Sequence, residues 1–136
     1  MSEKKHEINF ERWSGGEEDV VGEAMGFIYK GRWYAMLLTK AGMYRGSHIH
    51  NINQRTMLLN GKGKYVFKVD GKNVEHPLCV GEPLFVPKGT PHVLLPEEDC
   101  LTAEWWEGEF HEEAYDFPEY MDGIRAKIKK VMDDEN

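Results

Sequence analysis

Three histidines in two glycine-framed segments carry the strongest chemical signal of the sequence. His48 and His50 are two residues apart, so both side chains point to the same face if the segment forms a strand. His92 follows residues 87–91, a rigid Pro-Lys-Gly-Thr-Pro turn that would deliver it to an adjacent strand. Three imidazoles would then converge on one point. Neutral imidazole suits transition metals, so we predict a site for one divalent metal ion, with Fe, Mn, Ni, Zn and Cu all left open.

Gln54 is a candidate fourth ligand. It lies four residues after His50 and can share the same face if the strand continues through a bend. Its amide oxygen would bind the ion weakly. Because glutamine brings no negative charge, the ion would keep its full charge and act as a stronger Lewis acid toward a substrate oxygen.

Residues 102–107 contain the candidate catalytic group. In a strand, Thr102, Glu104 and Trp106 face one way and the intervening residues face the other. If the first set faces the metal, Glu104 is a candidate general acid or base. The alternative is a surface glutamate in water. Trp106 would either form a wall of the substrate pocket or fill the core.

Other side chains receive weaker predictions. The side chains expected to line the barrel are Tyr34, Met36, Met57 and Phe67. Tyr34 is also a candidate for the substrate pocket. Arg45 and Arg55 flank the first histidine segment. Each is either a contact for an anionic substrate or a surface cation, and Arg55 is the candidate for the substrate pocket. The remaining histidines are interpreted as surface or hydrogen-bonded residues: His6, His76 and His111.

The elements that must position these residues are short strands. Apolar runs alternate with glycine-rich turn signals between residues 24 and 107, which is typical of an all-β barrel or sandwich. The runs are Ala24–Tyr29, Trp33–Thr39, Gln54–Leu59, Lys64–Val69, Leu84–Val86, His92–Leu95 and Cys100–Trp106. Asp70-Gly71 predicts a two-residue hairpin turn.

The two ends of the chain differ from this central part. Residues 1–23 are polar and are predicted to form an arm over the surface that can include one edge strand. Residues 24–110 are assigned to the barrel and 111–136 to an extension, with a helix at about 118–133. Apolar residues at helical spacing in that helix (Met121, Ile124, Ile128 and Val131 or Met132) indicate packing on the barrel or, alternatively, a dimer contact.

Composition narrows the class of protein. A chain of 136 residues suits one domain, and a net charge of −7 argues against nucleic-acid binding. The sequence contains no apolar run long enough for a secretory signal or a membrane span, and we expect a cytoplasmic protein. Cys79 and Cys100 are expected to be buried thiols.

The two histidine segments resemble the cupin superfamily. Its first motif, G-x5-H-x-H-x3,4-E-x6-G, is matched by Gly42, His48, His50 and Gly61, with Gln54 in place of the glutamate. Its second motif, G-x5-P-x-G-x2-H-x3-N, is matched by Gly81, Pro87, Gly89 and His92, with Pro96 in place of the asparagine. The resemblance covers residues 24–107 and implies a jelly-roll barrel, a double-stranded β-helix with a metal ion inside one mouth.

A narrower resemblance concerns the ligand set. His48, His50, Gln54 and His92 look like the ligands of small cupins that open unsaturated uronate rings in pectin and alginate breakdown. Those proteins also carry an acidic residue and an aromatic residue two positions later, and Glu104 and Trp106 match these. Their additional arginine has no clear counterpart here.

Three functions remain open at this stage. The first is a metal-dependent isomerase or lyase that moves a proton next to a carbonyl of a small oxygenated molecule such as a sugar acid. The second is an Fe(II)-dependent dioxygenase, and the third is a non-catalytic protein that binds a small ligand. Small cupins often pair, so a homodimer is also expected, in which the arm could add a strand to a neighbour's sheet edge.

Overall fold

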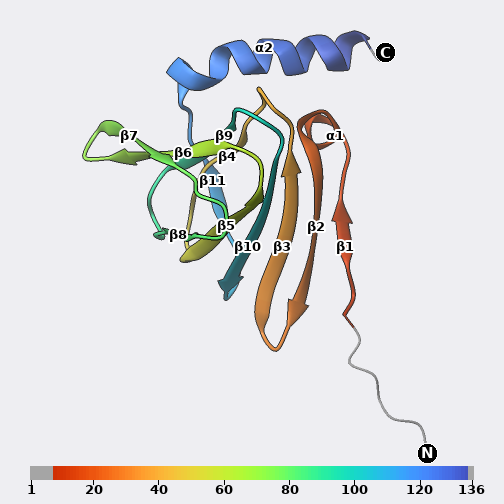
Figure 1. The fold of residues 1–136 in the computed structure, drawn as a ribbon, viewed down its shortest axis with the longest axis vertical. Helices are drawn as coiled ribbons and strands as arrows, with labels where there is room; N and C mark the ends of the chain where they lie inside the picture. Colours follow the sequence, from red (N-terminus) through yellow and green to blue (C-terminus); the bar gives the residue numbers. More distant parts are fainter. Residues whose placement is uncertain (1–7, 135–136) are drawn as a thin grey trace, which may run out of the picture.

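Two antiparallel β-sheets form the body of the molecule, and a C-terminal helix lies across one end of it (Figure 1). The computed structural model describes residues 8–134. The first sheet has the strand order β1 (Glu11–Trp13), β2 (Gly22–Tyr29), β3 (Arg32–Thr39), β10 (Cys100–Glu107), β5 (Gln54–Asn60), β8 (Pro83–Val86). The second has the order β11 (Glu112–Ala114), β4 (Arg45–His50), β9 (His92–Pro96), β6 (Gly63–Val69), β7 (Lys72–Pro77).

The predicted all-β class is confirmed, and so is the predicted hairpin. β6 and β7 pair through a turn in which Asp70 and Gly71 have φ angles of 50° and 76°. Positive φ at both central residues is the requirement of a type I′ turn, which Asp-Gly meets with little strain. The seven predicted apolar runs correspond to strands whose bounds agree with them to within two residues at each end, namely β2, β3, β5, β6, β8, β9 and β10.

The two flanking segments join the sheets. From the predicted arm, β1 pairs with β2, and the short helix α1 (Glu17–Val21) follows it. From the extension, β11 pairs with β4. Residues 1–7 of the arm and 135–136 of the extension lie outside the described residues.

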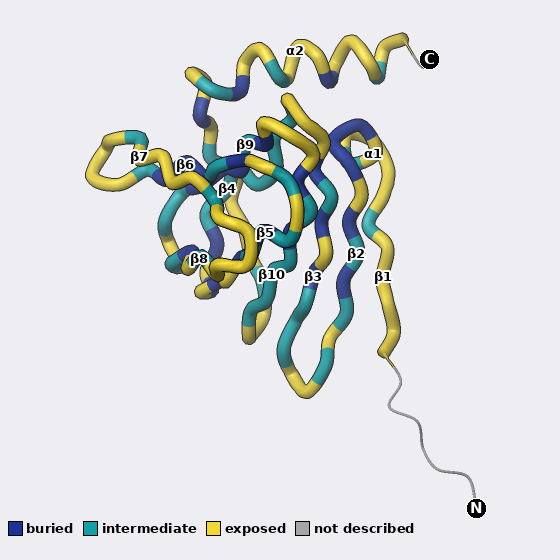
Figure 2. Tube along the Cα trace, in the orientation of Figure 1, coloured by how far each residue is buried: buried dark blue, intermediate teal, exposed yellow. Residues whose placement is uncertain are grey.

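The helix α2 (Pro118–Asp134) packs on the barrel, which confirms the first of the two interpretations of its apolar stripe. Met121 contacts Val66 and Val93 of the second sheet, and Ile128 contacts Val20 and Val21 of α1. In Figure 2 the buried positions of α2 lie on the side toward the barrel, and most other positions are exposed. The helix therefore closes one end of the core and joins the two ends of the chain.

A close approach between β2 and β3 gives a stability prediction. A Cβ atom added at Gly22 would lie 1.8 Å from the carbonyl oxygen of Leu38, and this backbone atom has little freedom to move. We expect Gly22→Ala to lower the free energy of unfolding by about 3 kcal/mol. The control is Gly123→Ala in α2, where no atom lies within 4 Å of the added methyl group and alanine favours the helix by about 1 kcal/mol. Urea denaturation of both variants checks the opposite signs, and an unchanged Gly22→Ala variant would contradict the predicted clash.

The cysteine prediction is half wrong. Cys100 is buried, and its burial raises the pKa of the thiol, but Cys79 is exposed. Cys79 lies between β7 and β8, outside any strand, so neither sheet covers it. Within the described residues, none of the helices has the length and apolar character needed to cross a membrane.

Candidate metal centre

Adjacent strands of the second sheet deliver the three histidines. β4 carries His48 and His50, and the Cα of His48 is directly opposite that of His92 on β9. A bulge precedes His48, with Gly46 and Ser47 at φ angles of 95° and 64°. Glycine tolerates such angles, and the bulge sets the register that turns both β4 histidines inward. β4 is thus the predicted strand with His48 and His50 on one face, and the bulge makes its first residues irregular.

The three imidazoles are close enough to share one ion. Their ring centroids are 4.4–4.9 Å apart, and one nitrogen from each lies within 4.8 Å of the others. Two nitrogens at about 2.1 Å from one metal ion are at most about 4.2 Å apart, so a small side-chain movement closes the site.

Hydrogen bonds fix the orientation of two of the rings. The Nδ1 of His92 is 2.9 Å from the carbonyl oxygen of Thr90, and the Nδ1 of His48 is 2.8 Å from Oε2 of Glu112 on β11. Both partners accept a hydrogen bond from the Nδ1–H group, which leaves the Nε2 lone pair free as a metal ligand. The bond from His48 also lowers the pKa of Glu112.

His50 provides the observation that tests the fit of a metal ion. Both of its ring nitrogens are buried and have no hydrogen-bond partner among the described residues. Burial lowers the pKa of His50 to about 4 and that of His92 to about 3, so both rings are neutral at pH 7. Neutral, unpaired and inward-facing imidazole nitrogen is what a transition metal requires. The donor set therefore fits a metal ion held by His48, His50 and His92.

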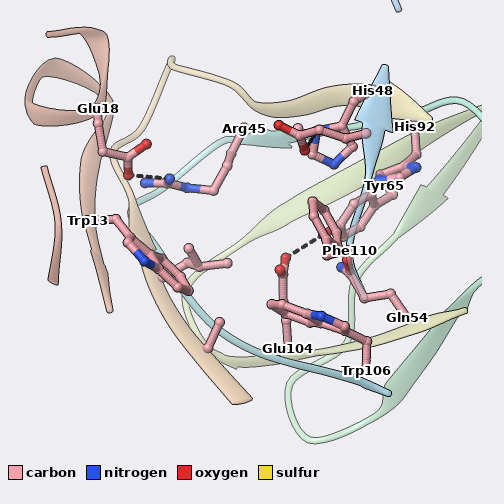
Figure 3. Close-up of a pocket in the computed structure, with 14 residues that line it drawn as sticks. Trp13, Glu18, Arg45, His48, Gln54, Tyr65, His92, Glu104, Trp106 and Phe110 are labelled. Carbon is pink, nitrogen blue, oxygen red and sulfur yellow. Dashed lines mark hydrogen bonds and ion pairs between the residues drawn. The ribbon is translucent and has the colours of Figure 1, made fainter. Parts of the chain in front are cut away.

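A cavity of about 440 Å³ adjoins this group (Figure 3). Its wall includes six of the candidate site residues, His48, Gln54, His92, Glu104, Trp106 and Arg45, together with eight others. Those eight are Trp13, Glu18, Ala35, Leu37, Gly46, Tyr65, Phe110 and Glu112. The cavity lies between the two sheets, because its wall takes residues from β3, β5 and β10 of one and β4, β6 and β9 of the other.

Glu104 projects into this cavity from β10. Its Oε1 is 3.3 Å from the hydroxyl of Tyr65, which is itself 3.4 Å from Oγ1 of Thr56. Burial raises the pKa of the Glu104 carboxyl, while His48, Arg45 and the hydrogen bonds from Tyr65 and Gln54 act in the opposite direction. Glu104 is thus not a surface glutamate in water, which was the alternative interpretation.

Gln54 lies in the cavity wall with 3% of its surface exposed. Its Nε2 donates a hydrogen bond of 3.0 Å to Oγ1 of Thr56. This bond commits the amide nitrogen and leaves the amide oxygen as an acceptor, as a ligand would require. Its binding to a metal ion remains a prediction.

The far side of the cavity contains a partly buried ion pair. Arg45 donates to Oε1 of Glu18 at 2.5 Å, to Oγ1 of Thr39 at 2.9 Å and to the carbonyl oxygen of Leu38 at 3.1 Å. Glu18 belongs to α1, and Trp13 of β1 lies beside the pair in Figure 3. The N-terminal segment therefore forms one wall of the cavity.

Two predicted pocket residues lie elsewhere. Tyr34 precedes Ala35 in β3, and because Ala35 lines the cavity, Tyr34 points to the opposite face of the strand. There its ring stacks on that of Phe27, with the centroids 5.4 Å apart. Arg55 follows the buried Gln54 in β5 and points to the opposite face of the strand. Its Cζ atom lies 4.9 Å from the centroid of the Phe85 ring. Alternation along a strand thus turns both away from the metal centre.

The prediction of barrel lining is corrected for two methionines for the same reason. Met36 lies between the buried Ala35 and Leu37 of β3, and Met57 between the buried Thr56 and Leu58 of β5. Both therefore point outward. Phe67 is buried in the core, as expected. Of the remaining histidines, His76 and His111 are exposed, and His6 is outside the described residues.

Sequence reasoning missed several residues of the site. Tyr65 reaches Glu104 from a strand 39 residues away, and Glu112 and Phe110 come from the segment assigned to the extension and its border. Phe110 lies 5.0 Å from His50 and 5.3 Å from Trp106, measured between ring centroids. On β6, Tyr65 stands between Lys64 and the buried Val66, so alternation along the strand gave no clear signal for its inward position.

Comparison with solved structures identifies the fold. The capsular polysaccharide assembling protein CapF from Staphylococcus aureus is 19% identical with a TM-score of 0.67, over 80% of this chain and 35% of that one. Hazelnut (Corylus avellana) vicilin is 14% identical with a TM-score of 0.65, over 77% and 34%. Oxalate decarboxylase from Bacillus subtilis, described with Mn(II) centres, is 18% identical with a TM-score of 0.62, over 75% and 29%.

The chain spans about a third of the length of these solved structures. No family model matches the sequence, and no curated protein matches it. At these identities the similarity concerns the fold, which is shared with proteins of the cupin type.

Proposed function

We propose that the chain, which has the cupin fold, is a metal-dependent enzyme that moves a proton next to a carbonyl group of a small oxygenated molecule, such as a sugar acid. One observation carries the proposal. The carboxyl group of Glu104 lines the same cavity of about 440 Å³ as His48 and His92, two members of the three-histidine group. A proton-transfer enzyme needs this combination, and a protein that only binds a ligand does not.

Glu104 is suited to exchange a proton with a substrate carbon. Burial raises its pKa above that of a free glutamate, which makes its carboxylate a stronger base. The hydroxyl of Tyr65, at 3.3 Å, holds the carboxyl group in place through Oε1. A divalent ion held by the three histidines would act as a Lewis acid on a substrate oxygen.

The rest of the cavity fits a small polar ring compound. Trp106 and Phe110 give an aromatic wall beside the histidines, which excludes water and can stack on a ring. Arg45 is the cavity wall's one arginine, and Glu18 neutralises it. Two of the compared proteins are named for oxygen-rich compounds, a capsular polysaccharide and oxalate, which is compatible with this class of substrate.

Solvent deuterium exchange tests the proposal. Protein loaded with Mn²⁺ or Zn²⁺ is incubated in D₂O with a panel of keto and unsaturated sugar acids, and proton NMR follows each compound. We expect at least one compound to lose a proton signal at the carbon next to its carbonyl, at a rate that depends on the added metal.

The other two functions give different results in the same mixtures. Oxygen consumption that requires Fe²⁺, without proton exchange, would favour the dioxygenase. Saturable binding with neither exchange nor oxygen consumption would favour a binding protein. Either result would overturn the proposed proton transfer.

A further inference from the structure

A second cavity lies on the opposite side of the strands that line the metal cavity. Its volume is about 530 Å³, and its wall takes residues from β3, β5 and β10 and from the loops β4–β5 and β8–β9. Arg55 of β5 and Trp105 of β10 are directly opposite one another in this wall. Their neighbours Gln54 and Trp106 line the metal cavity, so alternation turns Arg55 and Trp105 to the other face of the sheet. We name this second cavity the outer groove.

The outer groove carries positive charge that the protein itself does not neutralise. Its wall contains three cations, Arg32, Arg55 and Lys88, and one carboxylate, that of Glu107. Arg32 donates to Oε1 of Glu107 from Nε at 3.0 Å and from Nη2 at 2.5 Å, which occupies this carboxylate. Among the residues that the structure describes, neither Arg55 nor Lys88 forms an ion pair. Two positive charges therefore remain in the groove of a chain that has 24 acidic and 17 basic side chains.

The guanidinium of Arg55 is held in position by a contact that leaves its donors available. Phe85 belongs to the neighbouring strand β8 and is directly opposite Arg55, and the contact described above places the guanidinium over its ring. A contact with an aromatic face uses none of the five N–H donors of the guanidinium. This fixed fork of donors suits a carboxylate, which it can bind through two parallel hydrogen bonds.

Hydrogen bonds hold the two loops of the outer groove together before any ligand binds. Oδ1 of Asn53 accepts a hydrogen bond of 2.9 Å from the backbone N–H of Lys88. The next residue, Gly89, donates from its backbone N–H to the carbonyl oxygen of His50 at 2.9 Å. Because the side-chain oxygen of Asn53 is used in this way, its amide nitrogen is the atom that can donate to a ligand. Loops that are already ordered lower the entropic cost of binding.

Trp105 gives the outer groove an aromatic surface that no other ring covers. The sequence contains four tryptophans, and three of them face one another. The ring centroids of Trp13 and Trp33 are 6.5 Å apart, and those of Trp33 and Trp106 are 6.1 Å apart. Within residues 8–134, Trp105 has no such ring contact, and its side chain is half-buried in the groove wall. The flat face of an indole ring in this position can pack against the apolar face of a sugar ring.

These features together define the chemistry of the ligand. It carries negative charge for Arg55 and Lys88, a ring for Trp105 and oxygen atoms that accept hydrogen bonds from Asn53. A sugar with a carboxylate group has all three properties. Phosphate groups are typically bound at helix N-termini, and neither α1 nor α2 contributes to the groove wall. Nucleic acids bind through many more phosphate contacts than two cations can make.

We propose that the outer groove binds an acidic saccharide, with its carboxylate on Arg55 and Lys88 and a sugar ring on Trp105. The volume of about 530 Å³ lies in the range of about 300–1,000 Å³ that is usual for small-molecule sites, and it has room for more than one sugar ring. The site is separate from the metal centre, so the proposal goes beyond the proposed function and does not depend on proton transfer by Glu104.

Calorimetric titration of the whole Zn²⁺-loaded chain tests the proposal. The probe is the β-1,4-linked trisaccharide of glucuronic acid, and its neutral counterpart is cellotriose, which differs from it only in lacking the carboxylates. We expect a dissociation constant below about 1 mM for the acidic trisaccharide and binding of cellotriose that is at least about 10-fold weaker. Arg55→Gln and Lys88→Gln should each weaken binding of the acidic trisaccharide by about 10-fold or more, because each removes a charged donor.

Two control variants locate the binding. Arg12→Gln makes the same chemical change on β1 of the same sheet but outside the groove wall, and it should bind the probe as the natural sequence does. Glu104→Gln, on the other face of β10, should also leave this binding unchanged, so a failure of the proton-transfer proposal gives a different result. Circular dichroism checks that the variants fold, which is expected because Arg55 and Lys88 are exposed.

Several results would overturn the proposal. One is the absence of binding at about 10 mM probe, and another is equal affinity for cellotriose. Binding that survives both Arg55→Gln and Lys88→Gln, or that Arg12→Gln weakens equally, would place the saccharide elsewhere on the protein. Displacement of the probe by an equal concentration of inorganic phosphate would show that the groove binds anions in general rather than an acidic saccharide.

Discussion

Glu104→Gln is expected to reduce kcat/KM for the proton exchange by about 100- to 10,000-fold, the range typical of a lost general acid or base. Glutamine keeps the shape of the side chain and can still contact the hydroxyl of Tyr65, but it cannot accept a proton from a carbon atom. The metal affinity should stay within a few-fold of the natural value, because Glu104 is not among the three histidine donors. Calorimetric metal titration and NMR exchange rates measure the two quantities separately.

Glu107→Gln provides the control for this prediction. It makes the same chemical change three residues further along β10, where the exposed carboxylate pairs with Arg32 and does not line the cavity. Its exchange rate should match that of the natural sequence. Retained exchange in Glu104→Gln would exclude Glu104 as the proton carrier, and metal loss in that variant would mean that the carboxyl group belongs to the metal centre instead.

His50→Ala is expected to weaken metal binding by more than about 100-fold. Removing the hydrogen-bond partner of a metal ligand typically lowers the metal affinity 10- to 100-fold. Removing the ligand itself should lower the affinity further. Because both His50 nitrogens are buried and unpaired, the metal-free protein loses no hydrogen bond on this substitution. The rise in melting temperature on adding Zn²⁺ or Mn²⁺ should therefore disappear, while the melting temperature without metal changes much less.

His76→Ala is the matched control, because His76 is an exposed histidine on β7. It should bind the metal as the natural sequence does, which also excludes binding by scattered surface histidines. A full metal-dependent stabilisation in His50→Ala would remove His50 from the site and contradict the three-histidine centre.

The sequence was sufficient to place His48 and His50 on one face and to mark the turn before His92, because local rules govern these two steps. Side chains two apart in a strand share a face, and the Pro-Lys-Gly-Thr-Pro turn restricts the backbone before His92. Glycines and the Asp-Gly turn likewise marked the strand ends. The meeting of His92 with His48 also requires β9 to be the neighbour of β4, which these local signals do not encode.

Predictions that depended on strand neighbours or on the inward face of an isolated strand were less accurate. Tyr34 and Arg55 were assigned to the pocket, but a shift of one position in a strand reverses the face of every side chain. The contact of Tyr65 with Glu104 depends on how two sheets pack, and no local pattern encodes that. The same holds for Glu18, which reaches Arg45 across 27 positions of the sequence.

The contact between α1 and α2 also affects the order in which packing contacts can form while the chain is being synthesised. Val20 and Val21 of α1 pack on Ile128 of α2, and about 100 residues of chain separate the two helices. On the ribosome, the histidines and Glu104 emerge before this helix does. The segment that carries Glu18 gains its packing against Ile128 only after α2 has emerged. The metal ligands are therefore synthesised before the helix that packs against the N-terminal wall of the cavity.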